Sequence, residues 1–215
     1  MATSTPSLTR AQDEVGGPGD PAVPNLPSEV QRALLEIARA ALAAATDLAS
    51  GWTLAARVRR GVGSDLRAPV FVTLHELGAL RGCMGTLDPD QPIAEAVAAG
   101  AMTAALDDPR FYPIAAEELP DLRLDVSVLG PPVELRDLDA FVPGQDGVIV
   151  ERGPRHGLLL PEVAAARGWD AARMLTTACR KAGLPGDAWR EPGTRRWRFR
   201  TVRFGGPAVE PVPAR

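Results

Sequence analysis

The spacing of apolar residues changes its period several times along the chain, which is typical of a protein that mixes helices and strands. From Ser28 onward apolar residues recur every three or four positions, and this spacing predicts an amphipathic helix that ends before Gly51. Ser28 and Gln31 have the spacing of a capping box at its start. A second helix is expected over residues 93–106, after Pro92, and its many small residues allow close packing against a neighbour.

Patterns with a period of two predict strands in the middle of the chain. Residues 70–75 and 80–87 form a predicted β-hairpin whose turn lies over residues 76–79. Within the returning strand the two glycines, Gly82 and Gly85, mark a bulge or a close backbone approach. Residues 122–128 alternate apolar and polar side chains, which predicts a strand with one buried face.

The second half of the chain repeats this mixture of elements. A second hairpin is expected within GVIVERGPRHGLLLP, and RRWRFRTVRF is expected to form the last strand. Helical patterns over residues 162–167 and 171–182 lie between them, with Asp170 as a plausible N-cap and Gly183 just past the end. Strands and helices follow one another without a regular βαβ alternation, so the pattern favours an α+β fold over a doubly wound sheet.

Both ends of the chain are rich in proline and glycine. Such a composition buries too little apolar surface to offset the entropy of ordering, so residues 1–27 and 207–215 are predicted to be mobile tails. Residues 28–206 form the predicted folded part. The whole chain of 215 residues fits one domain, or one domain built as two lobes.

Composition narrows the classes of function. The net charge of -3 provides no global basic field, which disfavours a role in nucleic-acid binding. Two Cys and two His are too few for a zinc finger, an iron–sulfur cluster held by this chain alone, or a disulfide scaffold, so no metal site is expected. The sequence has no apolar run of about 20 residues and no apolar segment near its start, so neither a membrane span nor a signal peptide is expected. The expected compartment is the cytoplasm.

The stretch LRGCMG is the strongest candidate for chemistry. Strand alternation places Arg81 and Cys83 on one face, where a guanidinium would favour the thiolate form of the cysteine. Gly82 and Gly85 could expose backbone N–H groups to an anionic ligand. Cys83 is therefore a candidate nucleophile, redox thiol or ligand contact. The alternative is a small buried cysteine in a tight hairpin.

Two further groups are weaker candidates. His75 joins Arg81 and Cys83 only if the register of the hairpin permits it, because a slip of one residue moves it to the other face. In DDPRF, paired carboxylates could do acid–base work or bind a metal, and Asp107 and Arg110 could contribute to ligand binding. The alternative is that Asp-Pro ends a helix and that Arg110 pairs with a carboxylate.

The remaining features have a structural interpretation and a functional one. Cys179 shares a helical face with small and apolar residues, which predicts a core thiol. The arginines at 196, 198 and 200 share one face of the last strand and alternate with aromatic residues, a pattern that could clamp single-stranded RNA. The alternative is an edge strand whose arginines prevent edge-to-edge pairing, which the acidic balance of the chain favours.

Several ordered motifs together resemble one family. Over roughly residues 30–204 the chain resembles the AmmeMemoRadiSam system protein A family, also called the AMMECR domain family. The segments that carry the resemblance are VFVTL, LRGCMGTL, DDPRFYPI, EELPDLRLDVSVL, GVIVERG, GLLLPEVA, GWD, CRKAGLPGDAW and the terminal strand. Met84 stands where isoleucine is usual, which is a volume-tolerant change.

This resemblance implies a fold and a setting. The fold would have a mixed or antiparallel sheet with flanking helices, in a larger and a smaller lobe with a cleft between them. The motif cysteine and arginine of the family correspond to Cys83 and Arg81. The family name implies operation beside a Memo-like protein, which resembles extradiol dioxygenases, and a radical SAM protein. It names no cofactor and no reaction, because fold-level resemblance does not supply chemistry.

Three functions remain open from the sequence. The first is a thiol-dependent enzyme or substrate-handling subunit of that system, with a small-molecule ligand near Cys83, Arg81 and the glycines, and with Asp107 and Arg110 as contributors. The second is a non-catalytic binding or adaptor module that uses the same cleft for a partner peptide or a metabolite. The third, ranked last, is RNA binding through the terminal basic strand.

Overall fold

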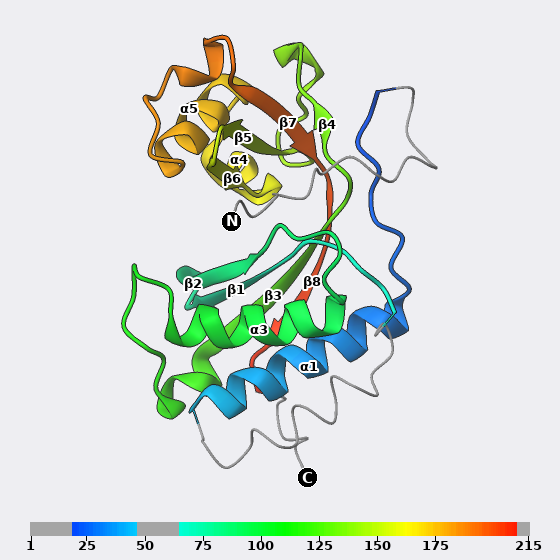
Figure 1. Cartoon of the computed structure of the whole chain (residues 1–215). Helices are drawn as coiled ribbons and strands as arrows, with labels where there is room; N and C mark the ends of the chain where they lie inside the picture. The colour runs from blue at the N-terminus through cyan, green and yellow to red at the C-terminus, as the bar shows by residue number, and fades with distance from the viewer. Residues whose placement is uncertain (1–18, 47–64, 210–215) are drawn as a thin grey trace, which may run out of the picture. The chain divides into compact units, whose positions relative to one another are not determined.

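The computed structural model describes residues 19–46 and 65–209, and these form two compact units. Unit 1 contains residues 19–24 and Leu129–Thr201, and unit 2 contains the described residues of Asn25–Val128 and those from Val202 onward (Figure 1). Each unit has one four-stranded sheet, and the strand pairings are antiparallel. The predicted α+β fold is thus confirmed. No helix within the described residues has the length and hydropathy that a membrane span requires.

Unit 2 is built on a sheet with the strand order β2-β1-β3-β8. Its strands are β1 (Val70–Glu76), β2 (Ala79–Thr86), β3 (Leu122–Leu129) and β8 (Thr201–Pro207). The predicted hairpin is confirmed as β1 and β2, and the two turn residues Leu77 and Gly78 have positive φ angles of 49° and 84°. Positive φ at both central positions is the geometry of a tight two-residue hairpin turn.

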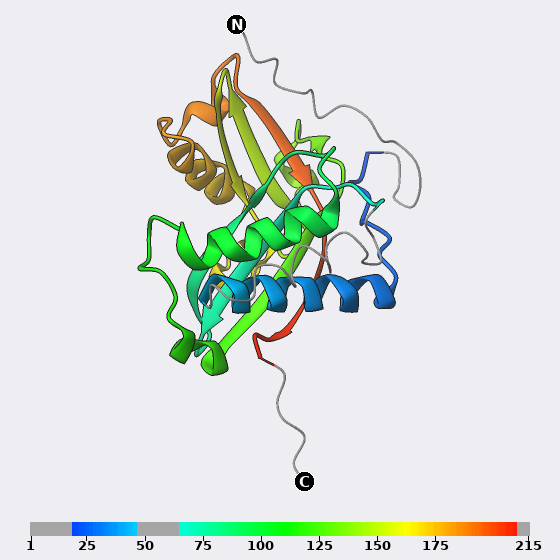
Figure 2. The same ribbon diagram turned by 60° about the horizontal axis from the view of Figure 1, so that its bottom comes forward.

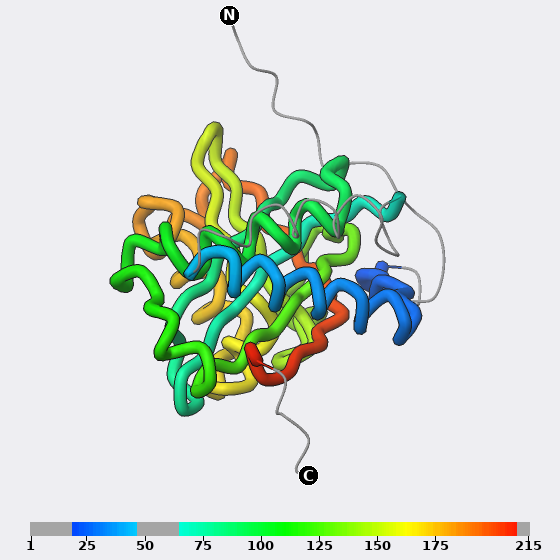
Figure 3. Tube along the Cα trace, turned by 90° about the horizontal axis from the view of Figure 1, so that it is seen from below, coloured from blue at the N-terminus to red at the C-terminus, as the bar shows by residue number. Residues whose placement is uncertain are grey.

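Two helices, α1 (Ser28–Thr46) and α3 (Ile93–Leu106), lie alongside each other against one face of this sheet (Figures 2 and 3). The second is the helix expected over residues 93–106, and Pro92 is its N-cap residue. Small side chains let α3 approach the strands closely: a Cβ atom at Gly100 would lie 3.2 Å from the side chain of Val72. Apolar residues of β1 and β3, such as Val72 and Val126, complete the core.

The start of α1 differs from the expected capping box. Ser28 is already the first helical residue, and the side-chain amide of Gln31 donates to the carbonyl of Leu26, 2.8 Å away. The backbone N–H of Gln31 donates to the carbonyl of Pro27. The described part of α1 runs to Thr46, and the limit expected before Gly51 falls in residues 47–64, which lie outside the described part of the chain.

Unit 1 has a sheet with the order β4-β7-β5-β6, packed against helices (Figure 1). Its elements are β4 (Val133–Glu134), β5 (Gly147–Arg152), β6 (Arg155–Leu159), β7 (Arg195–Phe199), α4 (Pro161–Arg167) and α5 (Ala171–Lys181). The described residues also include short 3-10 helices: η2 (Ala116–Asp121) in unit 2, and η3 (Leu138–Ala140) and η4 (Ala188–Arg190) in unit 1.

The predicted details of the second half are largely confirmed. The β5–β6 pair is the expected hairpin. Asp170 caps α5, because its carboxylate accepts a hydrogen bond of 2.8 Å from the N–H of Arg173. Gly183 follows that helix with a φ of 69°, the left-handed conformation that glycine adopts without steric cost.

The expected last strand is two strands in two different sheets. β7 ends at Phe199 and belongs to unit 1, whereas β8 begins at Thr201 and belongs to the sheet of unit 2. At the break, the carbonyl of Arg200 accepts a hydrogen bond from the N–H of Gly130. The apolar residues change parity at this break, from Trp197 and Phe199 to Val202 and Phe204, so the alternation itself shifts where the chain passes from one sheet to the other.

Residues 19–27 differ from the mobile tail that was expected up to residue 27. Asp20 lies 2.8 Å from the guanidinium of Arg198, and the carbonyl of Gly19 accepts a second hydrogen bond from the same group. The chain passes so close to Gly130 that a Cβ atom there would lie 2.2 Å from the carbonyl of Ala22. Leu26 is buried in the core of unit 2. Specific contacts thus offset the ordering entropy that composition alone could not.

Candidate functional site

The candidate site lies on the face of the unit 2 sheet that points away from its helices. Successive side chains of a strand point to opposite faces, so Val72 and Leu74 enter the core while Thr73 points to the other side. Strand register aligns Thr73 with Cys83 of β2 and with Asp125 of β3. These three residues form a polar row across the sheet, and it includes the candidate thiol.

Cys83 is half-buried and is bonded through both its side chain and its backbone. The hydroxyl of Thr73 donates to Sγ across 3.4 Å, and the backbone N–H of Cys83 donates to Oδ2 of Asp108 across 2.9 Å. Neither Cys83 nor Cys179 is part of a disulfide. A hydroxyl donor at the sulfur stabilises the thiolate more than the thiol, because the hydrogen bond is stronger to the charged form.

A buried carboxylate holds an arginine beside Cys83. The side chain of Asp108 is 1% exposed and accepts hydrogen bonds of 2.9 and 2.6 Å from Nε and Nη2 of Arg110. Nη2 also lies 3.5 Å from the carbonyl oxygen of Cys83. The Arg110 guanidinium lowers the pKa of Asp108 to about 2, and the Cys83 N–H adds to this effect. Asp108 raises the pKa of Arg110, and the charge of a Cys83 thiolate acts in the same direction.

Arg81 lies on the same strand as Cys83, but its guanidinium holds a loop. It binds both carboxylate oxygens of Glu118, at 2.8 and 3.0 Å, and it donates to the backbone carbonyl of Tyr112. The hydrogen bond from Arg81 lowers the pKa of Glu118. The ring of Phe111 lies within 6.0 Å of the Arg81 guanidinium and 5.3 Å of that of Arg110. Arg81 therefore ties the loop that carries Asp108 and Arg110 to β2.

Close packing accounts for the two glycines of LRGCMG. A Cβ atom at Gly82 would lie 2.3 Å from the carbonyl oxygen of Ala104, on α3. At Gly85 it would lie 2.1 Å from the carbonyl oxygen of Val70. The close backbone approach that the sequence indicated is therefore present at both glycines. At Gly82 the backbone of α3 approaches β2, and at Gly85 the backbone of β1 does so.

His75 lies next to Asp125, whereas the hairpin register places Thr73 opposite Cys83. Nδ1 of His75 is 3.4 Å from Oδ2 of Asp125, and Arg203 binds the same oxygen at 2.7 Å. A bulge between Leu74 and His75 shifts the β1–β2 register at this point. A hollow of about 420 Å³ opens here, lined by His75, Leu77, Gly78, Asp121, Arg123, Asp125 and Arg203.

The sequence interpretation missed three members of the cluster: Thr73, Asp108 and Glu118. In DDPRF it selected Asp107, which is the exposed C-cap residue of α3, while its neighbour Asp108 is buried against Cys83. The Asp-Pro step was the available signal, because a residue before proline is pushed out of the helix. Thr73 carried no signal beyond the alternation of β1.

The thiol and the arginines of unit 1 have structural roles. Cys179 is buried in the core, as predicted, and burial raises the pKa of its thiol. Arg198 is buried and pairs with Asp146 and Asp20, and Arg200 pairs with the same two carboxylates. Two of the three arginines of the hypothetical RNA clamp are thus neutralised within unit 1. Arg196 lies over the ring of Trp189, 5.8 Å from its centre.

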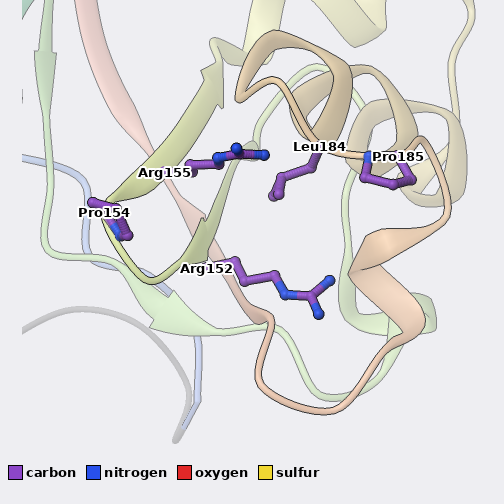
Figure 4. Close-up of a pocket in the computed structure, with 5 residues that line it drawn as sticks. All are labelled: Arg152, Pro154, Arg155, Leu184 and Pro185. Carbon is purple, nitrogen blue, oxygen red and sulfur yellow. The ribbon is translucent and has the colours of Figure 1, made fainter.

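In the part of the chain that the structure describes, no three His, Cys, Asp or Glu side chains lie close enough together to hold a metal ion. A second hollow, of about 290 Å³, lies in unit 1 between the β5–β6 hairpin and the residues after α5 (Figure 4). It is lined by Arg152, Pro154, Arg155, Leu184 and Pro185.

Fold and site together define an α+β protein of two sheet units, with a hydrogen-bonded thiol on the polar face of one sheet. The AMMECR1 family model matches residues 30–204, so the chain belongs to the AMMECR1 family. It is 47% identical over 144 residues to a protein of Methanothermobacter thermautotrophicus, covering 64% of this chain and 75% of the relative. It is 44% identical over 145 residues to protein TK0174 of Thermococcus kodakarensis, covering 63% and 71%.

A solved structure has a similar fold. The crystal structure of the uncharacterized protein PH0010 from Pyrococcus horikoshii superposes with a TM-score of 0.73 and 32% sequence identity. The match covers 85% of this chain and 95% of PH0010. The shared fold thus extends over both units of the chain.

Proposed function

We propose that this protein is a thiol-dependent enzyme or substrate-handling subunit of an AmmeMemoRadiSam-type system, with Cys83 as its reactive thiol. In that setting it acts with a Memo-like protein, similar to extradiol dioxygenases, and with a radical SAM protein. The observation that carries the proposal is the environment of Cys83: a threonine hydroxyl bonded to Sγ at 3.4 Å, with the Asp108–Arg110 pair on its backbone.

This environment supports a reactive thiolate. Thr73 supplies a hydrogen bond to the sulfur, and Arg110 supplies a positive charge whose side chain remains 48% exposed. A cysteine near a guanidinium has a larger thiolate fraction at neutral pH than an isolated one. Because Asp108 is ionised above pH of about 2, the arrangement of Arg110 persists through the physiological range. Cys179 offers the internal contrast, because burial raises the pKa of its thiol.

Timed labelling with iodoacetamide near neutral pH, read by peptide mass spectrometry, tests the thiol. We expect Cys83 to react faster than Cys179 in the native protein. Thr73→Val and Arg110→Gln should each lower the rate of iodoacetamide labelling at Cys83 by about threefold to tenfold, because each removes a group that favours the thiolate. Arg136→Gln is the matched control, since it removes an equal charge from an arginine whose side chain is 84% exposed in unit 1. Equal inertness of both thiols until denaturant is added would overturn the proposal.

The setting is tested in cells. Metabolite profiles of cells with and without the gene, complemented by wild type or by Cys83→Ser, should separate the two complemented strains. A profile restored fully by Cys83→Ser would exclude a thiol-dependent activity.

A non-catalytic adaptor is the second candidate, because two large apolar side chains of unit 2 are almost fully exposed. Tyr112 is 88% exposed and Leu77 is 92% exposed, and Arg81 fixes the backbone of Tyr112. Exposed aromatic side chains on a fixed loop are typical anchors of protein interfaces. Loss of partner binding in Tyr112→Ala, together with unchanged partner affinity and system activity in Cys83→Ser, would favour the adaptor.

A further inference from the structure

We infer that the hollow of unit 1 beside the β5–β6 hairpin is a second ligand site, which binds a small molecule with an anionic head, carboxylate or phosphate, and an apolar body. The site is independent of Cys83, which lies in unit 2. The second site is built from the turn of GVIVERGPRHG and from the GLP sequence after α5. Neither segment takes part in the thiol chemistry proposed for Cys83.

Two arginines supply donors for an anionic head group. Arg152 and Arg155 stand on either side of the hairpin turn, and in Figure 4 they border one open space from opposite sides, with Arg155 extending toward Leu184. Arg152 binds Glu191 at 2.6 Å, and Arg155 donates to the carbonyl of Gly183 at 2.9 Å. Each guanidinium has five N–H donors in a planar fork that suits carboxylate and phosphate oxygens. Most of these donors are therefore available to a ligand.

The charge of the hollow favours an anion. Arg152, Arg155 and Glu191 sum to one positive charge. The Arg152–Glu191 pair is exposed, with 39% and 46% of the two side chains accessible, and such a pair contributes little to stability. An anionic ligand can therefore take the place of Glu191 on Arg152 at small cost. Nη1 of Arg155 donates to the carbonyl of Gly183, two residues past the end of α5, and this bond orients the guanidinium before a ligand arrives.

Apolar side chains supply the rest of the site. Pro154, Leu184 and Pro185 line the hollow, and Leu184 is only 9% exposed. Prolines and a leucine fixed by the core form a rigid surface for a ring or a short alkyl chain. The volume of about 290 Å³ is at the lower end of the range for small-molecule sites, so the ligand is compact.

Titration of the full-length protein with three matched probes tests the site. Phenyl phosphate and phenylacetate carry the two head groups on the same ring, and benzyl alcohol carries no charge. We expect shifts of backbone amide resonances at the hairpin and at the GLP segment with either anion, and binding at least about tenfold weaker for the alcohol. The anion that binds more tightly identifies the head group. Binding should also weaken as salt rises, because exposed charges are screened.

Variants separate a binding site from a basic surface. Arg155→Gln and Arg152→Gln should each weaken binding of the preferred anion by about tenfold, whereas Arg136→Gln, which loses an equal charge elsewhere in unit 1, should not. Glu191→Gln should tighten binding severalfold, because it removes the competing carboxylate. Thermal unfolding of each variant shows whether the fold is intact. Absence of binding at about 10 mM of either anion, equal binding of the alcohol, or loss of affinity in Glu191→Gln would overturn the inference.

Discussion

Each unit has a buried aspartate bonded to an arginine, yet the two arginines differ in what they can do. In unit 1 the side chains of Asp146 and Arg198 are 0% and 5% exposed, so the pair is enclosed. In unit 2 the Asp108 side chain is 1% exposed, but 48% of Arg110 is accessible beside Cys83. An enclosed pair is structural, because its charges have no access to a ligand. A pair with an open guanidinium is preorganised for recognition.

The largest expected effect concerns the enclosed pair. Asp146→Ala should lower the free energy of unfolding by about 3 kcal/mol or more, because it leaves Arg198 buried with less compensation and removes the acceptor for the N–H of Val142. Chemical denaturation followed by tryptophan fluorescence measures it, since Trp169, Trp189 and Trp197 lie in unit 1. Glu134→Ala, which breaks the exposed pair with Arg136, is the control and should cost less than about 1 kcal/mol. If Asp146→Ala and Glu134→Ala lower the free energy of unfolding by the same amount, the enclosed pair is no more important to stability than the exposed one.

A second prediction tests the packing beneath the thiol. Gly82→Ala should destabilise by about 2 kcal/mol, because the added Cβ would lie 2.3 Å from the carbonyl of Ala104 and α3 must move. Gly186→Ala is the control in unit 1, since its Cβ would meet only the movable side chains of Arg180 and Thr176. Hydrogen exchange at the amides of α3 localises the effect. A neutral Gly82→Ala would contradict the close approach of the helix.

The open pair should make stability depend on pH in acid. The Asp108 pKa falls from 3.8 to about 2 in the folded protein, so this carboxylate stabilises the fold above about pH 4 and loses its effect as pH falls toward 2. The contribution is about 2 kcal/mol. Asp108→Asn should flatten this part of a pH series of denaturant midpoints, while the exposed Asp107→Asn should leave it unchanged. If the denaturant midpoint of Asp108→Asn depends on pH between about 2 and 4 as it does in the wild type, the Asp108–Arg110 pair stabilises the fold no more than a surface ion pair does.

The smallest effect concerns the hairpin tip of unit 2. Leu77 has a φ of 49° and is 92% exposed, so it bears backbone strain without burying its side chain. Leu77→Asn should raise the free energy of unfolding by about 0.5–1 kcal/mol, because asparagine tolerates the left-handed conformation. Leu80→Asn, in the adjoining strand, should not stabilise. Thermal unfolding of both variants measures these changes in stability. A lower unfolding temperature in Leu77→Asn would show that the leucine side chain contributes to the fold.

The sequence by itself determined most of the local structure. The bounds of α3, the two hairpins, the cap at Asp170 and the buried thiol of Cys179 all follow from patterns within a few residues. These features depend on backbone propensity and on the alternation of burial, which neighbouring residues record directly. The thiol motif was visible in the same way, because glycines inside a strand already indicate a close approach.

Tertiary structure alone decided which groups meet. A bulge after Leu74 and the β1–β2 register place Thr73 opposite Cys83 and leave His75 with Asp125. The Asp-Pro step marks Asp108 as the end of the helical segment, but only the fold brings its carboxylate to the N–H of Cys83 on β2. The change of parity after Arg200 does not say that β7 and β8 belong to two sheets, and Arg198 binds Asp20 across 178 positions of sequence. Register, helix termination and long-range ion pairs depend on partners distant in the chain, which a local pattern does not record.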